Sequence, residues 1–405
     1  MTHLRLHFRV ALCLPACAGL LLLAGCLSMR GGTPSPNSAT AAEDCVDAET
    51  LNRIVAQLAE DDSVKPGGPR YNVLVLSTGG PYGAFSAGML VGWSEAGTRP
   101  KFDCVTGVST GALVSVFAFV GPAWDDKLAS VLSDLNAEKI YRMRGPVAML
   151  RRSSFASSEP LQRLIEDTVD MELLRAVANA HAEGRRLYVG TTNLETKRLA
   201  VWDMGAIASR GDAEALKLFQ TIMLASCSIP GFFEPVPIDV QVNGQSRSEL
   251  HVDGGASASM FLRLPEQAQS LRGRRPLAGS NLYIIVAGKL YADPAPVRPG
   301  FIPVAGSSIS SLMYAEARGD LYRLFTTSLA SGMKFQLAAV PQQFAINPNN
   351  ASFGPKEIKQ LYEEGVRAGH SPNPWRSLPP GSEDGEQAQL SSHGPQSMPQ
   401  RDIAR

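Results

Sequence analysis

The stretch KFDCVTGVSTGALVSVFAFVG, residues 101–121, joins a short apolar strand pattern to an apolar helical run through a Gly-x-Ser-x-Gly motif. The motif consists of Gly107, Ser109 and Gly111, and by itself it is too short to identify a catalytic serine. Its position predicts a sharp turn that projects the Ser109 hydroxyl from the carboxyl edge of a sheet. The positive end of the following helix would then face this hydroxyl and favour negative charge near it.

A second glycine-rich turn, STGGPYGAF at residues 77–85, follows another buried strand pattern, YNVLVLS at residues 71–77. Gly79, Gly80 and Gly83 can present backbone N–H groups to a developing oxyanion, because no side chain stands in the way. A phosphate-binding loop is the alternative use of such a turn. It is disfavoured, since no Gly-Lys-Ser/Thr follows and the spacing is not Gly-x-Gly-x-x-Gly.

The stretch LHVDGG, residues 250–255, contains the candidate bases for the serine. Asp253 ends a predicted strand there and precedes Gly254 and Gly255; in a dry site this carboxylate could take the serine proton. Taken alone, Asp-Gly-Gly is an ordinary turn sequence. His251 is the alternative base, and its spacing of two residues from Asp253 puts both side chains on one face of a strand.

The three motifs together, in this order, resemble the patatin-like phospholipase family. VGTTNLETKRLAVWD at 189–203 and LASCSIPGFFEPV at 224–236 add to the resemblance, which covers about residues 70–370. The resemblance implies that Ser109 is the nucleophile and Asp253 the base of a Ser-Asp dyad. It also implies that the glycines of the first turn supply the oxyanion hole, and that the histidine beside the aspartate is a bystander.

The first turn departs from the family pattern, which begins with three glycines and has Arg or Lys before the last one. Thr78 replaces the first glycine, Pro81 fills the variable position, and Tyr82 stands where the basic residue is expected. Pro81 has no N–H to donate, but that position need not donate. We expect the missing cation to affect substrate preference more than catalysis.

The alternation of strand and helix patterns predicts an α/β fold: a three-layer α/β/α sandwich with a mostly parallel central sheet, patatin-like. The predicted acyl hydrolase domain covers residues 46–370 and includes a more polar helical insert at about 122–185. Residues 371–405 are rich in Pro, Ser, Gly and Gln, a composition typical of a disordered tail.

The N-terminus resembles a lipoprotein signal. Residues 1–25 combine basic residues with an apolar run, and Leu-Ala-Gly precedes Cys26 as in a lipobox. Cys26 would then be lipidated and anchor the chain to a membrane, with residues 26–45 as a flexible tether. Leu27 is not acidic, which favours the outer membrane of a bacterial envelope, facing the periplasm. An ordinary signal peptide with an incidental cysteine is the alternative.

The remaining cysteines leave two possibilities open. In an oxidising compartment Cys45 and Cys104 could form a disulfide, and two free buried thiols are equally consistent with the sequence. Cys227 lies in an apolar stretch and is predicted to belong to the core.

The expected function is a membrane-tethered serine hydrolase that cleaves a phospholipid, lysophospholipid or neutral-lipid ester. The formal net charge of +0 and the lack of a basic stripe argue against nucleic acid as a partner. No cofactor or metal is implied. Two alternatives remain at this level: a lipid-binding lipoprotein with impaired catalysis, and an acyltransferase on a related fold that uses His251 as its base.

Overall fold

The computed structural model describes residues 70–382, apart from 134, 136, 146–153, 243–244, 265, 270–274, 294–295 and 345–353. The predicted signal peptide, Cys26, the tether and Cys45 lie outside the described residues.

A sheet of eight strands forms the middle of the fold, in the order β10-β9-β1-β2-β5-β8-β7, with β6 paired to β5. The five strands from β10 to β5 are parallel, whereas β6, β8 and β7 join antiparallel. The predicted mostly parallel sheet is therefore confirmed, with an antiparallel margin. The strands are β1 Asn72–Leu76, β2 Cys104–Val108, β5 Arg186–Asn193, β6 Arg198–Asp203, β7 Val236–Val242, β8 Gln245–Asp253, β9 Asn281–Val286 and β10 Lys334–Ala339.

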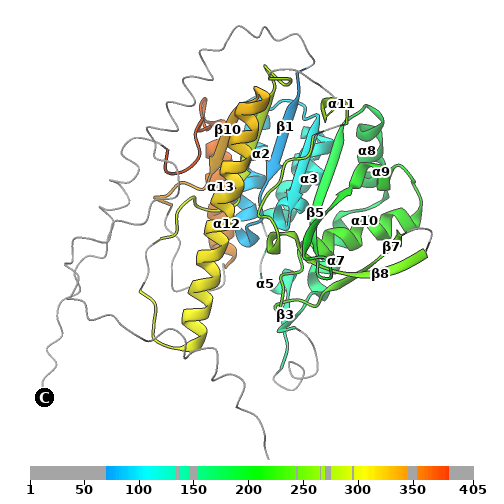
Figure 1. Ribbon diagram of the computed structural model, residues 1–405, viewed down its shortest axis with the longest axis vertical. Helices are drawn as coiled ribbons and strands as arrows, with labels where there is room; N and C mark the ends of the chain where they lie inside the picture. The colour runs from blue at the N-terminus through cyan, green and yellow to red at the C-terminus, as the bar shows by residue number, and fades with distance from the viewer. Residues whose placement is uncertain are drawn as a thin grey trace, which may run out of the picture. The chain divides into compact units, whose positions relative to one another are not determined.

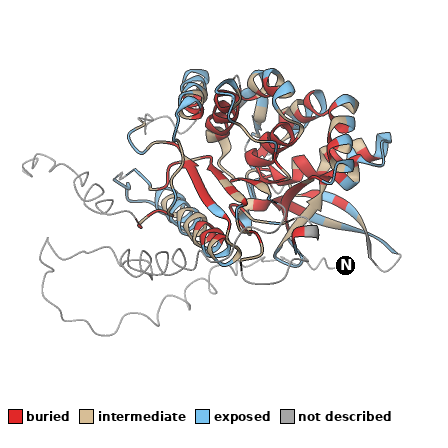
Figure 2. Ribbon diagram, turned by 90° about the horizontal axis from the view of Figure 1, so that it is seen from above, coloured by how far each residue is buried: buried red, intermediate tan, exposed pale blue. Residues whose placement is uncertain are grey.

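Helices cover both faces of the sheet, which confirms the three-layer sandwich (Figure 1). Side chains of β1 alternate between the two faces: Leu74 and Leu76 pack in the larger core, and Val73 and Val75 pack with α12. Figure 2 shows buried strands between helices on either side. The helices are α2 Gly83–Glu95, α3 Thr110–Val120, α4 Asp125–Leu132, α5 Ala137–Ile140, α7 Glu159–Thr168, α8 Met171–Ala182, α9 Met204–Ala208, α10 Ala213–Ser226, α11 Glu266–Gln269, α12 Phe301–Ser331 and α13 Pro355–His370, with 3-10 turns η1 Gly80–Tyr82, η2 Pro122–Trp124 and η3 Gly254–Ala256.

The parallel strands explain why the site forms where it does. Both β1 and β2 are buried apolar runs that need cover on two faces. Each is followed at its carboxyl end by a tight turn and a helix, α2 and α3 respectively. Since parallel neighbours end at the same edge, the two glycine-rich turns of the sequence lie side by side at that edge.

The region 122–185 contains α4, α5, α7 and α8, together with a two-stranded sheet of β3 (Arg142–Met143) and β4 (Ala156–Ser157). It is thus mostly helical among its described residues.

The chain beyond Ser371 differs from the expectation of disorder, at least as far as residue 382. Arg376 exchanges two backbone hydrogen bonds of 2.8 Å with Leu337 of the edge strand β10, and Tyr322 donates a 2.9 Å hydrogen bond to the carbonyl of Pro380. An edge strand offers unpaired backbone groups, and this polar segment satisfies some of them despite its composition. Residues 383–405 lie outside the described part.

Candidate active site

The turn that carries Ser109 is strained and enclosed. Ser109 has φ 57° and ψ −127°, a backbone conformation that residues with a side chain rarely adopt. Such a conformation costs about 1–3 kcal/mol and persists only where the surroundings enforce it. Gly111 is one cause: a Cβ there would stand 2.6 Å from the carbonyl oxygen of Leu76 and 2.5 Å from that of Ser77. The predicted sharp turn is present, and glycine lets α3 start directly against the end of β1.

A buried serine from α10 holds this turn to the sheet. The backbone N–H of Ser109 donates a 2.9 Å hydrogen bond to Ser226 Oγ, which in turn donates at 2.8 Å to the carbonyl of Gly190. Sequence reasoning does not single out Ser226 as a site residue. Its only signal is its position in the stretch LASCSIPGFFEPV, which resembles the family.

Strand register brings Asp253 to the same level as the nucleophile turn. Val108, the last residue of β2, pairs with Gly190 of β5, and the next β5 residue, Thr191, pairs with Asp253 of β8. Gly254 then lies against the same strands, because a Cβ there would stand 2.6 Å from the Gly190 carbonyl oxygen.

The Ser109 hydroxyl lies near enough to the Asp253 carboxylate to lower the pKa of that carboxyl as a hydrogen-bond donor. The structure therefore brings these two predicted residues together. Both are buried, with 5% and 4% of their surfaces exposed respectively.

The environment of Asp253 suits a base. Burial raises the pKa of this carboxyl from 3.8 to about 6, and hydrogen bonds from the Ser109 hydroxyl and the Gly255 backbone partly offset the rise. The Gly255 N–H donates at 2.8 Å to Oδ1. A carboxylate with a pKa of about 6 is ionised at neutral pH and is more basic than an ordinary aspartate.

The first glycine-rich turn lies against the start of α3. Thr110 Oγ1 donates a 2.9 Å hydrogen bond to the carbonyl of Gly80, whose own φ is 51°. Gly83 begins α2 so close to Thr110 that a Cβ there would stand 2.1 Å from Cγ2 of that threonine. Gly79 faces the backbone of Ala287 at the end of β9, where a Cβ would stand 2.0 Å from the carbonyl oxygen. All three predicted oxyanion glycines therefore belong to a turn that touches the nucleophile helix.

Tyr82 occupies the position where a basic residue was expected. Burial raises the pKa of its phenol to about 12, and Tyr314 and Asp293 add to the rise. The phenol is therefore neutral at working pH. Asp293, one of the groups that raise the pKa of Tyr82, is itself paired with a cation, since its carboxylate lies 2.5 Å from Lys289 Nζ.

His251 is buried, and its ring contacts groups other than the nucleophile. Its Nδ1 lies 2.9 Å from Thr191 Oγ1, and its Nε2 lies 3.5 Å from the Glu249 carboxylate. Trp202 Nε1 donates to the same threonine oxygen at 2.7 Å, and its ring meets the imidazole edge to face. Burial lowers the pKa of His251, against the opposing effect of Glu249. Both ring nitrogens are thus directed at residues that do not take part in the predicted dyad.

The two described cysteines are buried thiols. Cys104 donates to the carbonyl of Arg263 across 2.9 Å, and burial raises the pKa of its thiol. Cys227 lies in the core as predicted, and burial together with the nearby Asp253 raises its pKa. The structure thus has Cys104 as a free thiol, while Cys45, its possible disulfide partner, lies outside the described residues.

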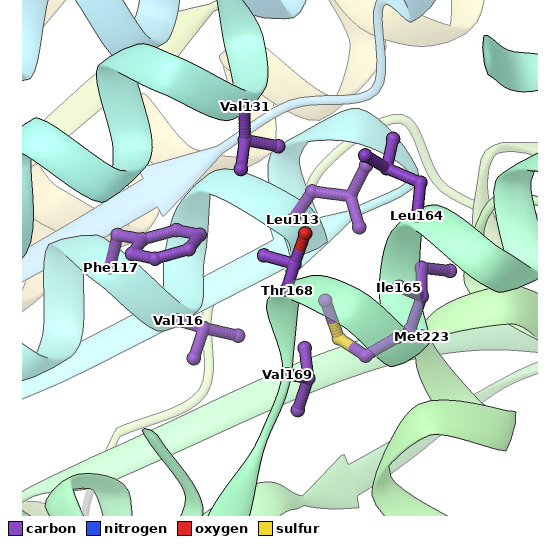
Figure 3. A pocket seen from close by; sticks show the side chains of 9 residues that line it. All are labelled: Leu113, Val116, Phe117, Val131, Leu164, Ile165, Thr168, Val169 and Met223. Carbon is purple, nitrogen blue, oxygen red and sulfur yellow. The ribbon is translucent and has the colours of Figure 1, made fainter. Parts of the chain in front are cut away.

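A small apolar cavity of about 10 Å³ borders the nucleophile helix (Figure 3). Leu113, one turn after Ser109, is part of its wall. At this size the cavity holds about one water-sized sphere. The lining residues are Leu113, Val116, Phe117, Val131, Leu164, Ile165, Thr168, Val169 and Met223.

Within the described part of the chain, no cluster of three or more His, Cys, Asp and Glu side chains could hold a metal ion. None of the described helices has the combination of length and hydropathy needed to cross a bilayer.

A strained serine between strand and helix, a buried carboxylate and a glycine-rich turn thus meet at the carboxyl edge of the sheet. Residues 74–264 match the model of the family described as patatin-like phospholipase, so the chain contains a patatin-like phospholipase domain. The match to this family is evidence for a lipid acyl hydrolase activity, without specifying the substrate. Among solved structures, VipD from Legionella pneumophila aligns over 80% of this chain and 68% of its own, with 13% identity and a TM-score of 0.37. No curated protein matches.

Proposed function

We propose that this protein is a serine lipid acyl hydrolase that works through a Ser109–Asp253 dyad. The observation that carries the proposal is the buried contact between the Ser109 hydroxyl and the Asp253 carboxylate, whose pKa is raised to about 6. Raised basicity and a nucleophile within hydrogen-bonding reach are the two properties that an acyl-transfer site needs.

In the first half of the proposed reaction, Asp253 accepts the hydroxyl proton while Ser109 Oγ attacks the ester carbonyl carbon. The carbonyl oxygen becomes an oxyanion, which backbone N–H groups of the turn at residues 79–83 and the N-terminus of α3 stabilise. Collapse of the tetrahedral intermediate breaks the ester bond. The leaving alcohol takes the proton from Asp253, and the acyl group remains on Ser109.

In the second half, Asp253 accepts a proton from water, and the resulting nucleophile attacks the acyl-enzyme. The fatty acid leaves, and the proton returns to Ser109 Oγ. The low exposure of both side chains supports this scheme, since a site with little bulk water strengthens each electrostatic contribution.

The environment of His251 argues against the acyltransferase alternative. A histidine base must reach the serine proton, yet both nitrogens of this ring face Thr191 and Glu249. The strained turn at Ser109 argues against an impaired lipid binder, because nothing in binding alone calls for such a conformation.

The decisive experiment is labelling of the full chain with a fluorophosphonate probe, in the wild type and in Ser109→Ala. We expect labelling of the wild type only. Labelling of both proteins, or of neither, would count against Ser109 as a nucleophile. Fatty-acid release from phospholipid, lysophospholipid and neutral-lipid esters would then identify the substrate class.

We further propose that the chain is anchored through lipidated Cys26 to the outer membrane of a bacterial envelope, on the periplasmic side. The order of basic, apolar and small residues before Cys26 supports this. An anchored enzyme would meet its lipid substrate at high local concentration. Metabolic labelling with a palmitate analogue tests the proposal: Cys26→Ser should abolish incorporation, and persistent labelling at the N-terminus would contradict it.

A further inference from the structure

The helix α12 is fixed to the site at its middle. Asp320 Oδ2 accepts hydrogen bonds of 2.8 Å from the Ser259 N–H and 3.3 Å from the Met260 N–H. The same loop also binds the glycine-rich turn at residues 77–83. The Thr78 N–H donates a 2.9 Å hydrogen bond to the carbonyl of Ser259. Asp320 therefore marks the point along α12 that lies beside the loops of the candidate active site.

From this point the N-terminal half of α12 extends past the carboxyl edge of the sheet. The helix leads into β10, which is parallel to β9 and β1, so α12 runs opposite to these strands. Met313 lies seven residues before Asp320, and Phe301 lies nineteen residues before it. At 1.5 Å per residue, they stand about 10 Å and about 28 Å further along the helix. Figure 1 shows this yellow half of α12 continuing beyond the end of β1.

This half of α12 is apolar, uncharged and exposed. No Asp, Glu, Lys or Arg occurs from Pro299 to Ala315. At 100° per residue, its large exposed apolar side chains fall within about half of the helix circumference. Single exposed apolar residues are normal, whereas a contiguous group marks an interaction surface. The group consists of Phe301 (88% exposed), Val304 (50%), Ile309 (58%), Leu312 (70%) and Met313 (52%).

The residue that follows the exposed group lies near the glycine-rich turn at residues 79–83. Tyr314, the residue directly after the group, is close enough to Tyr82 to raise the pKa of its phenol, and burial raises the pKa of Tyr314 itself. Tyr82 belongs to η1, beside the proposed oxyanion donors. The first half of α12 therefore ends on the same side of the molecule as the turn that carries the proposed oxyanion donors.

We propose that residues 301–313 of α12 insert into the surface of a phospholipid bilayer and place the active site against it. The inference rests on the proposed function, since a lipid ester must pass from the bilayer to Ser109. A surface without charge over this length suits the acyl boundary of a membrane, where a charged side chain is costly. Shallow insertion requires only that the side of the helix with these five side chains enters the bilayer.

The insertion is tested by tryptophan fluorescence in the full-length protein, in a Ser109→Ala background so that no lipid is consumed. Phe301→Trp reports on the tip of α12, and Thr327→Trp reports on an exposed position in its other half. With phosphatidylcholine vesicles, we expect the added signal from position 301 to shift to shorter wavelength and to be quenched by brominated acyl chains. The signal from position 327 should do neither. Absence of quenching at position 301 overturns the proposal. A wavelength shift that appears without vesicles when the protein concentration is raised also overturns it, because a second copy of the chain would then cover the helix.

The functional consequence is tested with Ile309→Asp/Leu312→Asp, and Thr327→Asp/Ala330→Asp is the matched control on the same helix. We expect the first pair to lower hydrolysis of vesicle phospholipid by about tenfold or more, because charges oppose insertion. Hydrolysis of water-soluble p-nitrophenyl butyrate should stay within about twofold, because the site itself is unchanged. Equal vesicle hydrolysis in both pairs contradicts the proposal. If the wild type hydrolyses no ester while position 301 is still quenched, the proposed function fails and the insertion stands.

Discussion

Thr110 and Gly80 join the two glycine-rich turns of the site through a 2.9 Å hydrogen bond from Thr110 Oγ1 to the Gly80 carbonyl. The donor is the first residue of the nucleophile helix, and the acceptor lies in the turn proposed to bind the oxyanion. Since Gly80 has φ 51°, its peptide group depends on this contact for a defined orientation. The bond therefore sets the geometry of the proposed oxyanion donors relative to Ser109.

Thr110→Val should lower kcat by about tenfold, because an oxyanion hole is effective only when its donors are preorganised. KM should change little, and Thr110→Ser, which keeps the hydroxyl, should retain most of the activity. Steady-state kinetics on a soluble ester provides the measurement. Equal kcat values for the valine and serine variants would show that the hydrogen bond does not position the turn.

Asp253→Asn should abolish the base and stabilise the fold. Replacement of a general base costs about 100-fold or more in kcat. The folded-state pKa of about 6 lies above the ordinary value of 3.8, so the folded protein binds this proton more tightly than the unfolded chain does. Wild-type stability therefore falls as the pH rises through this range. The full effect above pH 6 is on the order of 3 kcal/mol.

Urea unfolding at two pH values checks that the free energy of unfolding of the wild type falls as the pH rises. Below about pH 3 the wild type and Asp253→Asn should be equally stable, since the Asp253 carboxyl is then largely protonated in both the folded and the unfolded chain. At pH 8 the asparagine variant should be the more stable one. In parallel, wild-type activity should rise with pH through about 6, as the carboxyl loses its proton. A wild type that is the more stable protein at pH 8 would mean that Asp253 is not a strained base.

Gly111→Ala should destabilise the protein by about 2–4 kcal/mol and inactivate it. The added methyl would collide with two backbone carbonyl oxygens at the end of β1, which cannot move without disturbing the oxyanion turn. Gly319→Ala is the control, since a Cβ there meets nothing within 4 Å. This control should keep full activity and gain up to about 1 kcal/mol from helix propensity. Thermal unfolding separates the two, and a Gly111→Ala protein of normal stability would contradict the packing described for α3.

His251→Gln should lower stability by about 1–3 kcal/mol, because it disturbs a buried hydrogen-bonded group, but the folded enzyme should keep kcat within about threefold. A histidine that served as the general base would instead cost about 100-fold or more. Kinetics below the unfolding temperature distinguishes the two roles. A large loss of kcat without unfolding would revive the acyltransferase alternative.

Local sequence carries much of the site. A glycine-rich turn or a Gly-x-Ser-x-Gly motif after a strand specifies a tight backbone path with exposed amides, whatever the rest of the fold does. Each motif alone is a weak signal, but the three in this order resemble one family, so Ser109, Asp253 and the glycines around them can be predicted together. The strand at 281–286 and the helix at 355–370 are equally predictable, because apolar runs and helical periodicity are local signals.

Other features have no local signal. The N-terminal half of α12 lacks the buried stripe that reveals a helix, so the sequence does not predict this helix. The composition of the tail after Ser371 favours disorder, yet β10 offers it an edge on which to pair. Ser226 resembles any small polar residue in the sequence, and only its contacts with Ser109 and Gly190 distinguish it.

The sequence by itself determined which groups are chemically able to act: a serine in a turn that only glycine neighbours permit, and an aspartate at a strand end. Tertiary structure alone decided that they meet. The antiparallel pairing of β8 with β5 turns Asp253 back to the edge where β2 delivers Ser109, and burial at that edge raises the pKa of the carboxyl. Strand order and desolvation depend on contacts between distant segments, which no single stretch of sequence encodes.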